Sequence, residues 1–180
     1  TQEGIYRHFS TIADTCDIPI VLYNVPGRTG VGIAAETVAR LVKNRNVLGV
    51  KEAAGSVERV SEILSLCDTS IMCGDDSLTV PMMLLGAKGV ISVASNIIPA
   101  ELKKMTDACA SGDFMTAVAM HRKYWRLFKD LFVESNPIPV KAAMAMLGMI
   151  EEEYRLPLCP LSDANREKLR NTVSECIRSV

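Results

Sequence analysis

The sequence predicts an α/β protein in which parallel strands alternate with helices and a tail of helices follows. Four short apolar runs rich in β-branched residues recur along the first half of the chain, with helical patterns between them. This alternation is typical of parallel strands joined by right-handed crossovers. After the fourth run only helical patterns remain. The chain has 180 residues, enough for one domain with a substantial core.

The predicted strands are short, and each helix between them carries one apolar stripe. Strands are predicted over residues 19–24, 47–53, 70–74 and 89–95. Helices are predicted over residues 4–16, 34–42, 58–66 and 78–85. Ser56 is a candidate cap for the third of these helices, and Asp76 or Ser77 is a candidate cap for the fourth.

The tail is predicted to contain further helices, over residues 99–111, 114–132, 138–149 and 163–177. Gly112 ends the first of them, and Asp113 caps the second. The third is expected to pack in a core, because Met at helical spacing usually reflects packing. Its apolar residues are Met144, Met146, Leu147 and Met149.

This pattern leaves two architectures open. Four parallel strands with covering helices could form a small doubly wound sheet, or they could form half of an eight-stranded barrel. Polar groups at the carboxyl ends of the strands bear on this choice, because barrel enzymes place their catalytic groups there.

Lys51 is the most informative residue at such a strand end. It closes the apolar run of residues 47–50, so its amine would enter a region of low dielectric, where the ammonium form is disfavoured. A neutral lysine amine attacks carbonyl carbon, which is the start of Schiff-base chemistry. The alternative is a lysine that extends outward into solvent and is held by Glu52. Position alone favours neither.

Other polar groups follow the first and third strands. The Tyr23 hydroxyl could relay protons, and the guanidinium of Arg28 could bind a carboxylate or a phosphate. The alternative is that Tyr23 packs in the core and that Arg28 is an exposed residue of a turn. The glycines of this loop lack the spacing of a dinucleotide-binding fingerprint. Gly74 would let a ligand approach the backbone. Asp75 and Asp76 favour a helix cap over a metal site, because neighbours in an extended segment point to opposite sides.

Composition excludes several classes of protein. The net charge of −1 provides no general attraction to nucleic acid or to anionic lipid, and no apolar run is long enough to span a membrane. The six cysteines form no C-x-x-C pair, and with two histidines they match no zinc pattern. Reduced thiols of this kind predict a cytoplasmic protein without a bound metal.

Several segments together resemble the dihydrodipicolinate synthase family. They are residues 23–30 (Tyr-Asn-Val-Pro-Gly-Arg-Thr-Gly), 51–53, 74–76 and 89–93, and the resemblance extends to residues 136–141. The first segment is the specific one. N-acetylneuraminate lyase and related aldolases of the wider superfamily share the tyrosine and the lysine but generally not the arginine loop.

The resemblance implies a (β/α)8 barrel followed by a helical domain. Residues 1–98 would be the carboxyl-terminal half of that barrel, and residues 99–180 would complete the barrel and form the helical domain. The chain begins at Thr1, not at a methionine, and its start resembles the loop after the family's fourth strand. Roughly two-fifths of a typical subunit is therefore expected to be missing.

The resemblance also implies an activity: condensation of pyruvate with aspartate semialdehyde to 4-hydroxy-tetrahydrodipicolinate, in the diaminopimelate route to lysine. Lys51 would form the imine with pyruvate, Tyr23 would relay protons, and Arg28 would hold a substrate carboxylate. The pocket would be lined by Gly74, Asp75 and the main-chain carbonyl of Ile91. No metal or organic cofactor is implied.

Some parts of the family's site have no match in this sequence. They are a threonine pair from the second strand, a tyrosine from the neighbouring subunit and the residues of the lysine feedback site. The isolated chain is therefore expected to be weakly active or inactive. Full-length relatives are commonly tetramers, so a homo-oligomer is expected.

Two alternatives to this activity are open. A sister aldolase would use pyruvate with another aldehyde, and Arg28→Ala would then leave turnover of aspartate semialdehyde unchanged. A noncatalytic, oligomerising fragment would keep the family core without its chemistry. Borohydride trapping with pyruvate separates that fragment from an enzyme, since only an enzyme gains covalent mass at Lys51.

Overall fold

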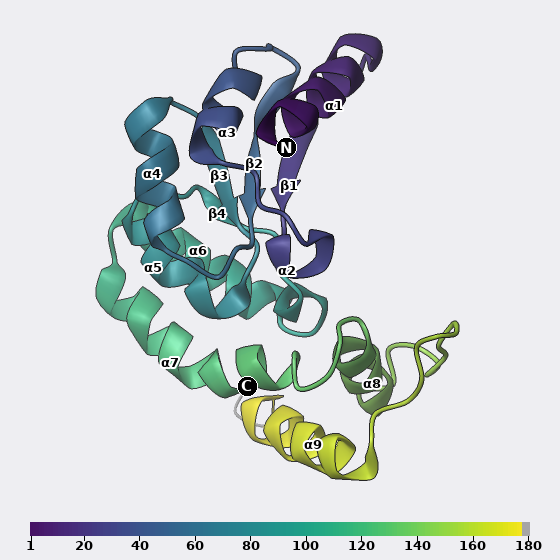
Figure 1. Ribbon diagram of the computed structural model, residues 1–180. Coiled ribbons are helices and arrows are strands. Elements are labelled where there is room, and N and C mark those ends of the chain that lie inside the picture. The colour runs from purple at the N-terminus through teal and green to yellow at the C-terminus, as the bar shows by residue number, and fades with distance from the viewer. Residues whose placement is uncertain (178–180) are drawn as a thin grey trace. The chain divides into compact units, whose positions relative to one another are not determined.

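The computed structural model describes residues 1–177, and the chain divides into two compact units (Figure 1). The first unit is Thr1–Ile91, and the second begins at Ser92. In the first unit strands and helices alternate as predicted: α1 (Gln2–Thr15), β1 (Ile20–Asn24), α2 (Pro26–Thr29), α3 (Ala35–Leu41), β2 (Val47–Glu52), α4 (Glu58–Leu66), β3 (Ser70–Cys73), the 3₁₀ turn η1 (Asp76–Leu78), α5 (Thr79–Leu84) and β4 (Gly89–Val90).

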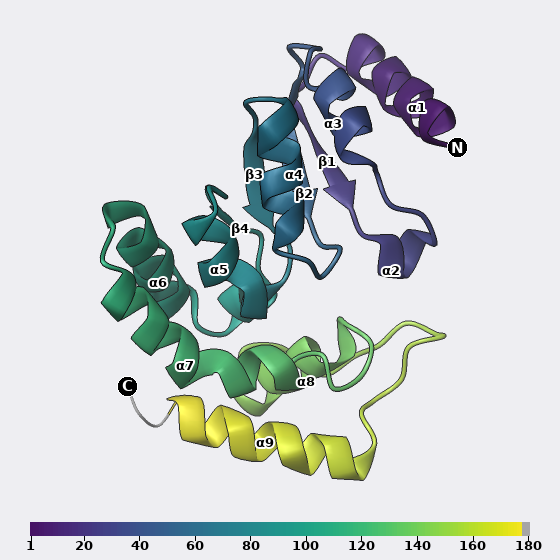
Figure 2. The same ribbon diagram turned by 60° about the vertical axis from the view of Figure 1, so that its left-hand side comes forward.

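The four strands form one parallel sheet in the order β1-β2-β3-β4. Each strand therefore lies beside the next one in the sequence, and the order never reverses. A doubly wound sheet has a point at which the strand order reverses, and none occurs among these four strands. Figure 2 shows α3 and α4 lying along the sheet, with α1 beside α3.

The core of the first unit lies between the sheet and these helices. Leu22, Val50 and Ile71 come from three neighbouring strands, and all three have no exposed surface. They pack in one cluster with Val38 of α3 and Ile63 of α4. Each fully buried aliphatic side chain contributes about 1.5–3 kcal/mol of hydrophobic free energy, so this interface holds the sheet and the helices together.

The opposite face of the sheet is open. Successive side chains of a strand point to opposite faces, so the neighbours of the buried residues point away from the helices. On β1, Val21 is 48% exposed and Tyr23 is 44% exposed. Ile91, directly after β4, is 44% exposed. Parallel sheets are normally covered on both faces, so an apolar face of this kind lacks its usual second layer in the described residues.

Several local predictions for this unit are wrong. β4 is predicted over residues 89–95 but ends at Val90, because the chain turns into the 3₁₀ helix η2 (Ala94–Asn96). The loop after β1 contains the short helix α2, which begins at Pro26 and ends before Gly30 in the left-handed conformation. Ser56 does not cap α4, whose cap residue is Val57, and no side chain caps η1 or α5.

The second unit is helical as predicted. Its elements are η2, α6 (Pro99–Ser111), α7 (Phe114–Asp130), α8 (Ile138–Met146) and α9 (Asp163–Ile177). Gly112 ends α6 at a φ of +83°, a conformation that favours glycine. Asp113 caps α7 by accepting a hydrogen bond from the amide of Thr116 at 3.1 Å. Both predicted helix boundaries are confirmed.

The core face of α8 differs from the prediction. The methionines Met144 and Met146 are only partly buried, and Met149 lies beyond the helix and is 51% exposed. The buried residues of the helix are Ile138, Pro139, Val140, Ala142 and Ala143.

Elsewhere in this unit, the Asp130 side chain of α7 is buried. The Lys168 ammonium of α9 lies 2.8 Å from it, and the Thr172 hydroxyl donates a hydrogen bond to it at 2.6 Å. None of the helices in residues 1–177 combines the length and apolar character that crossing a bilayer needs.

Candidate active site

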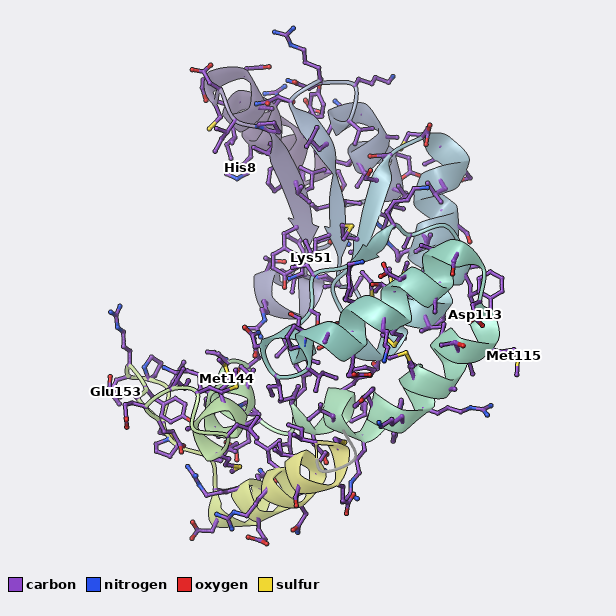
Figure 3. The ribbon with its side chains drawn as sticks, turned by 180° about the vertical axis from the view of Figure 1, so that it is seen from behind. His8, Lys51, Asp113, Met115, Met144 and Glu153 are labelled. Carbon is purple, nitrogen blue, oxygen red and sulfur yellow. The ribbon has the colours of Figure 1, made fainter. Side chains whose placement is uncertain are left out.

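The candidate site is built around Lys51 at the carboxyl edge of the sheet (Figure 3). The strand register pairs Lys51 of β2 with Tyr23 of β1, so both side chains lie on the open face. The Lys51 Nζ atom stands 4.2 Å from the centroid of the Tyr23 ring. An amine over an aromatic face at this distance is in cation–π contact, which restricts where the amine can lie. The structure thus brings together the two residues that the sequence predicts to be catalytic.

The environment of Lys51 is more open than its place at the end of an apolar strand predicts. Its side chain is only partly buried, and the Tyr23 ring beside it is 44% exposed. The described residues therefore do not enclose the amine in a region of low dielectric. Nor does Glu52 hold Lys51 as the outward-pointing alternative requires, because the Glu52 side chain is buried on the opposite face of the strand.

Gly74 lies directly against the stem of Lys51. A Cβ atom at this position would stand 2.5 Å from the Cβ of Ala53 and 3.2 Å from the Cε of Lys51. The backbone amide of Gly74 donates to the Glu52 carbonyl at 2.7 Å, which fixes the distance between the two chain segments. Glycine is required here because a side chain would collide with the neighbouring strand end and displace Lys51.

Asp75 follows Gly74 and is partly buried. Its backbone carbonyl accepts a bond from the Cys73 thiol at 3.1 Å. Burial raises the pKa of Cys73 to about 12, so this sulfur is a protonated thiol near neutral pH and not a nucleophile. Asp75 is positioned by the backbone at the start of η1, and its side chain does not cap that turn.

Arg28 and Ile91 come from loops at the same edge of the sheet. Arg28 is an exposed residue of α2, the helix that follows β1. Ile91 directly follows β4, and its amide donates to the carbonyl of Cys73 at 2.9 Å. All six predicted site residues therefore lie at or just after a strand end. Among them, Tyr23 lies against the Lys51 amine and Gly74 lies against its stem.

A buried polar network, which the strand and helix patterns do not predict, lies behind this site. Glu52 is 1% exposed and accepts hydrogen bonds from Asn24, the Ala54 amide and Arg59. Asn24 and Glu52 each directly follow a predicted catalytic residue in the sequence. An acid buried on the helix-facing side of a strand is itself the signal that could have indicated this network, since such a residue requires partners.

No cluster of three or more His, Cys, Asp or Glu side chains suited to a metal ion occurs in the part of the chain that the structure describes. The six cysteines are all free thiols. Beside the buried Cys73 thiol, the carboxyl edge carries the lysine, the tyrosine, the arginine and the carboxylates named above. This set suits covalent chemistry through an amine, with a phenol as the proton carrier and a guanidinium as an anion partner.

Comparisons with known proteins all point to the same family. Residues 1–176 match the Dihydrodipicolinate synthetase family. The 4-hydroxy-tetrahydrodipicolinate synthase of Geobacter metallireducens is 51% identical over 177 residues, which cover 97% of this chain and 61% of that protein. The chain thus spans about three-fifths of the length of the curated relatives that it matches.

Solved structures give the same picture. The 4-hydroxy-tetrahydrodipicolinate synthase of the methanotroph Methylacidiphilum fumariolicum superposes with a TM-score of 0.97 at 47% identity, over 99% of this chain and 60% of that one. A chloride-inhibited dihydrodipicolinate synthase from Acinetobacter baumannii, solved in complex with pyruvate, has a TM-score of 0.94 at 42% identity. The match includes 98% of this chain and 61% of the Acinetobacter chain.

Proposed function

Because the chain belongs to the dihydrodipicolinate synthetase family, we propose that it carries the Schiff-base centre of a lyase that condenses pyruvate with aspartate semialdehyde. The product would be 4-hydroxy-tetrahydrodipicolinate, in the diaminopimelate route to lysine. The observation that carries this proposal is the pairing of Lys51 and Tyr23, with the amine 4.2 Å from the ring centroid at the carboxyl edge of a parallel sheet. The pyruvate complex of the Acinetobacter relative supports the choice of keto acid.

The chemistry follows from the amine. The Lys51 nitrogen attacks the keto carbon of pyruvate, and loss of one water leaves an imine. The imine accepts electron density when a proton leaves the methyl group, which gives an enamine. The enamine carbon then forms a bond to the aldehyde carbon of aspartate semialdehyde, whose oxygen takes up a proton. The amino group that came from aspartate semialdehyde then attacks the imine carbon and displaces the Lys51 nitrogen, which closes the ring of the product and regenerates the lysine amine.

The other residues serve this sequence of proton transfers and binding steps. The Tyr23 hydroxyl gives and takes protons beside the amine. Arg28 binds a substrate carboxylate through its guanidinium. Gly74, Asp75 and Ile91 line the pocket, and Gly74 leaves room for the Lys51 stem. The reaction is assigned to these side chains and to the covalent imine, without a metal or an organic cofactor.

We place the chain in the carboxyl-terminal half of a (β/α)8 barrel, with residues 1–98 supplying the last four strands and residues 99–180 the helices that follow. Two observations support this placement: the strand order runs β1-β2-β3-β4 without reversal, and the sheet is covered on one face only. The remaining strands would cover Val21, Tyr23 and Ile91. The assembled enzyme would be a cytoplasmic homo-oligomer.

Borohydride trapping tests this function. Reduction in the presence of pyruvate should add the mass of one reduced pyruvate unit, and peptide mapping should place it on Lys51. Lys51→Ala should gain no mass at this position, whereas Lys43→Ala, which removes an exposed lysine of the same unit, should be labelled like the wild type. Labelling spread over several lysines, or none at Lys51, would remove the basis for the proposal.

A further inference from the structure

The polar network on the buried side of the sheet lies directly behind the candidate catalytic pair. The register pairs Tyr23 with Lys51, and one residue further along it pairs Asn24 with Glu52. Adjacent residues of a strand point to opposite faces, so each catalytic side chain on the open face has a network residue as its neighbour on the buried face. Asn24 and Glu52 are also the last residues of β1 and β2.

Glu52 is the centre of this network. The Asn24 amide nitrogen donates to its two carboxylate oxygens at 2.8 and 2.9 Å. The backbone amide of Ala54 donates to one of these oxygens at 2.9 Å, and the Nε of Arg59 lies 3.3 Å from the other. These donors use both oxygens of a carboxylate that is almost fully removed from water.

The partners extend the network into the surrounding structure. The Asn24 side-chain oxygen accepts from the Ile33 amide at 2.9 Å, and the Ile33 carbonyl accepts from Arg59 at 2.7 Å. Arg59 also pairs with Glu62 at 2.7 Å. One set of side chains therefore joins the ends of two strands, the loop at Ile33 and helix α4. Such a connection is rigid because Asn24, Glu52 and Arg59 are each held by more than one bond.

The ladder pairing of β1 and β2 ends at Asn24 and Glu52. Just beyond it, the Ala53 amide donates to the Asn24 carbonyl at 2.9 Å, and the Gly74 amide donates to the Glu52 carbonyl at 2.7 Å. Strand ends lose their pairing more readily than strand centres, so without side-chain bonds the residues before them would move. Those residues are Tyr23 and Lys51.

We propose that Glu52 is a positioning residue for the Lys51–Tyr23 pair, acting from the opposite face of the sheet through Asn24 and Arg59. By fixing the ends of β1 and β2 in register, it keeps the amine over the phenol ring. Displacements near 1 Å in a reacting group can lower a rate by about 100-fold, so the network controls the chemistry without touching substrate. The catalytic part of this inference rests on the proposed function. The geometric part does not.

The geometric part is tested by the ring current of Tyr23. Reductive methylation with ¹³C-formaldehyde labels the lysines, and the Lys51 signal, identified by its loss in Lys51→Arg, should be shifted by the ring 4.2 Å away. In Glu52→Gln an amide nitrogen would face the Asn24 amide, so the network breaks and the shift should disappear. A shift equal to that of the wild type in folded Glu52→Gln would overturn the proposal.

A matched control separates positioning from general stability. Asp130 is also a buried carboxylate, bonded to Thr172 and Lys168, but it lies in the second unit. Asp130→Asn should lower the stability of the chain yet leave the Lys51 signal and its trapping by pyruvate unchanged. If Asp130→Asn also removed the Lys51 shift, a structural role alone would explain Glu52→Gln.

The catalytic part is tested by the rate of borohydride trapping at Lys51. Glu52→Gln should slow it by about 10- to 100-fold per folded molecule, while an unchanged rate would reject the catalytic part of the proposal. If the wild type traps no pyruvate, the proposed function fails, whereas the ring-current result still decides the geometric role of Glu52.

A milder variant covers the case in which Glu52→Gln does not fold. Arg59→Lys keeps the positive charge, but one ammonium cannot serve Glu52, Glu62 and the Ile33 carbonyl together. It should reduce the Lys51 ring-current shift by part of its value. A shift identical to that of the wild type would count against the network as the positioning device.

Discussion

The two faces of the sheet in the first unit have opposite properties. On the face toward the helices, Leu22, Val50 and Ile71 have no exposed surface. On the other face, Val21 and Tyr23 are nearly half exposed. The difference shows that the described residues bury one side of these strands and leave the other side, which carries the proposed reactive groups, exposed. A change on one face should therefore affect stability, and a change on the other should affect chemistry.

The residues at the carboxyl edge show this division at its sharpest. Lys51 and Glu52 are neighbours in the chain, yet the amine lies on the open face against Tyr23 and the carboxylate is buried with Asn24 and Arg59. The alternation of side chains along the strand thus places the proposed reactive amine on one face and the carboxylate proposed to position it on the other. Three experiments on this sheet test how strictly the two faces are separated, and a fourth addresses a helix cap outside the sheet.

The largest effect is expected for Tyr23→Phe, on the open face. The phenylalanine ring can keep its contact with Lys51, so only the hydroxyl is lost. Loss of a proton-transfer group typically costs about 10²–10⁴-fold in rate. Exchange of the pyruvate methyl protons into D₂O, followed by NMR, should slow by this factor, while the urea midpoint of unfolding should stay the same. A lower midpoint would show that the open face also carries stability.

Two matched valines compare the faces directly. Val50→Ala removes two methyl groups from a fully buried position and should lower the free energy of unfolding by about 2–3 kcal/mol. Val21→Ala makes the same change at a position 48% exposed and should stay within about 0.5 kcal/mol of the wild type. Urea unfolding measures both. Equal losses would mean that the open face is covered in solution.

Gly74→Ala changes the carboxyl edge of the sheet, beside the stem of Lys51. Its new Cβ would collide with Ala53 and press on the Cε of Lys51, and overpacking of this kind costs about 1–3 kcal/mol. Gly27→Ala is the control, because a Cβ at that position meets no atom within 4 Å. Thermal unfolding should distinguish the two variants. If Gly74→Ala is as stable as the wild type, the strand ends are less tightly held than the distances imply.

The smallest effect is expected at Asp113, outside the sheet. Hydrogen bonds from Thr116 hold the pKa of this exposed carboxyl below its ordinary value. Because the pKa is lower in the folded state, the carboxylate stabilises the fold above its unfolded pKa, and this contribution is lost as the pH falls through the folded value. Asp113→Asn keeps a capping side chain but should remove this part of the acid dependence. Urea unfolding in neutral and acidic buffer would detect the difference, and an unchanged acid dependence in the variant would contradict it.

The strand positions and the catalytic candidates could be predicted from the sequence because their signals are local. Short β-branched runs identify buried strands, and the carboxyl ends of parallel strands meet at one edge. Lys51 and Tyr23 each stand at such an end and are paired in the structure. The caps at Gly112 and Asp113 depend only on neighbouring residues, and both were predictable for the same reason.

Other features could not be predicted because they depend on residues distant in sequence. The Asn24–Glu52 bonds span 28 residues, so the acid on the helix-facing side of β2 indicates that partners are needed but not which residues supply them. The methionine spacing predicts that the methionines of α8 are buried, whereas Ile138, Pro139, Val140, Ala142 and Ala143 are its buried residues. Which apolar side of a helix is buried depends on the partner against which it packs, and propensity does not contain that information.

By itself, the sequence determined the main strands and helices of the first unit, apart from α2 and the early end of β4, and which amine and phenol would end adjacent strands. Tertiary structure decided how open the Lys51 amine is, which face of the sheet the helices cover, and that Glu52 turns away from Lys51 toward Asn24 and Arg59. The physical reason is that secondary structure follows from local periodicity, whereas burial and hydrogen-bond partners are set by what packs against each face.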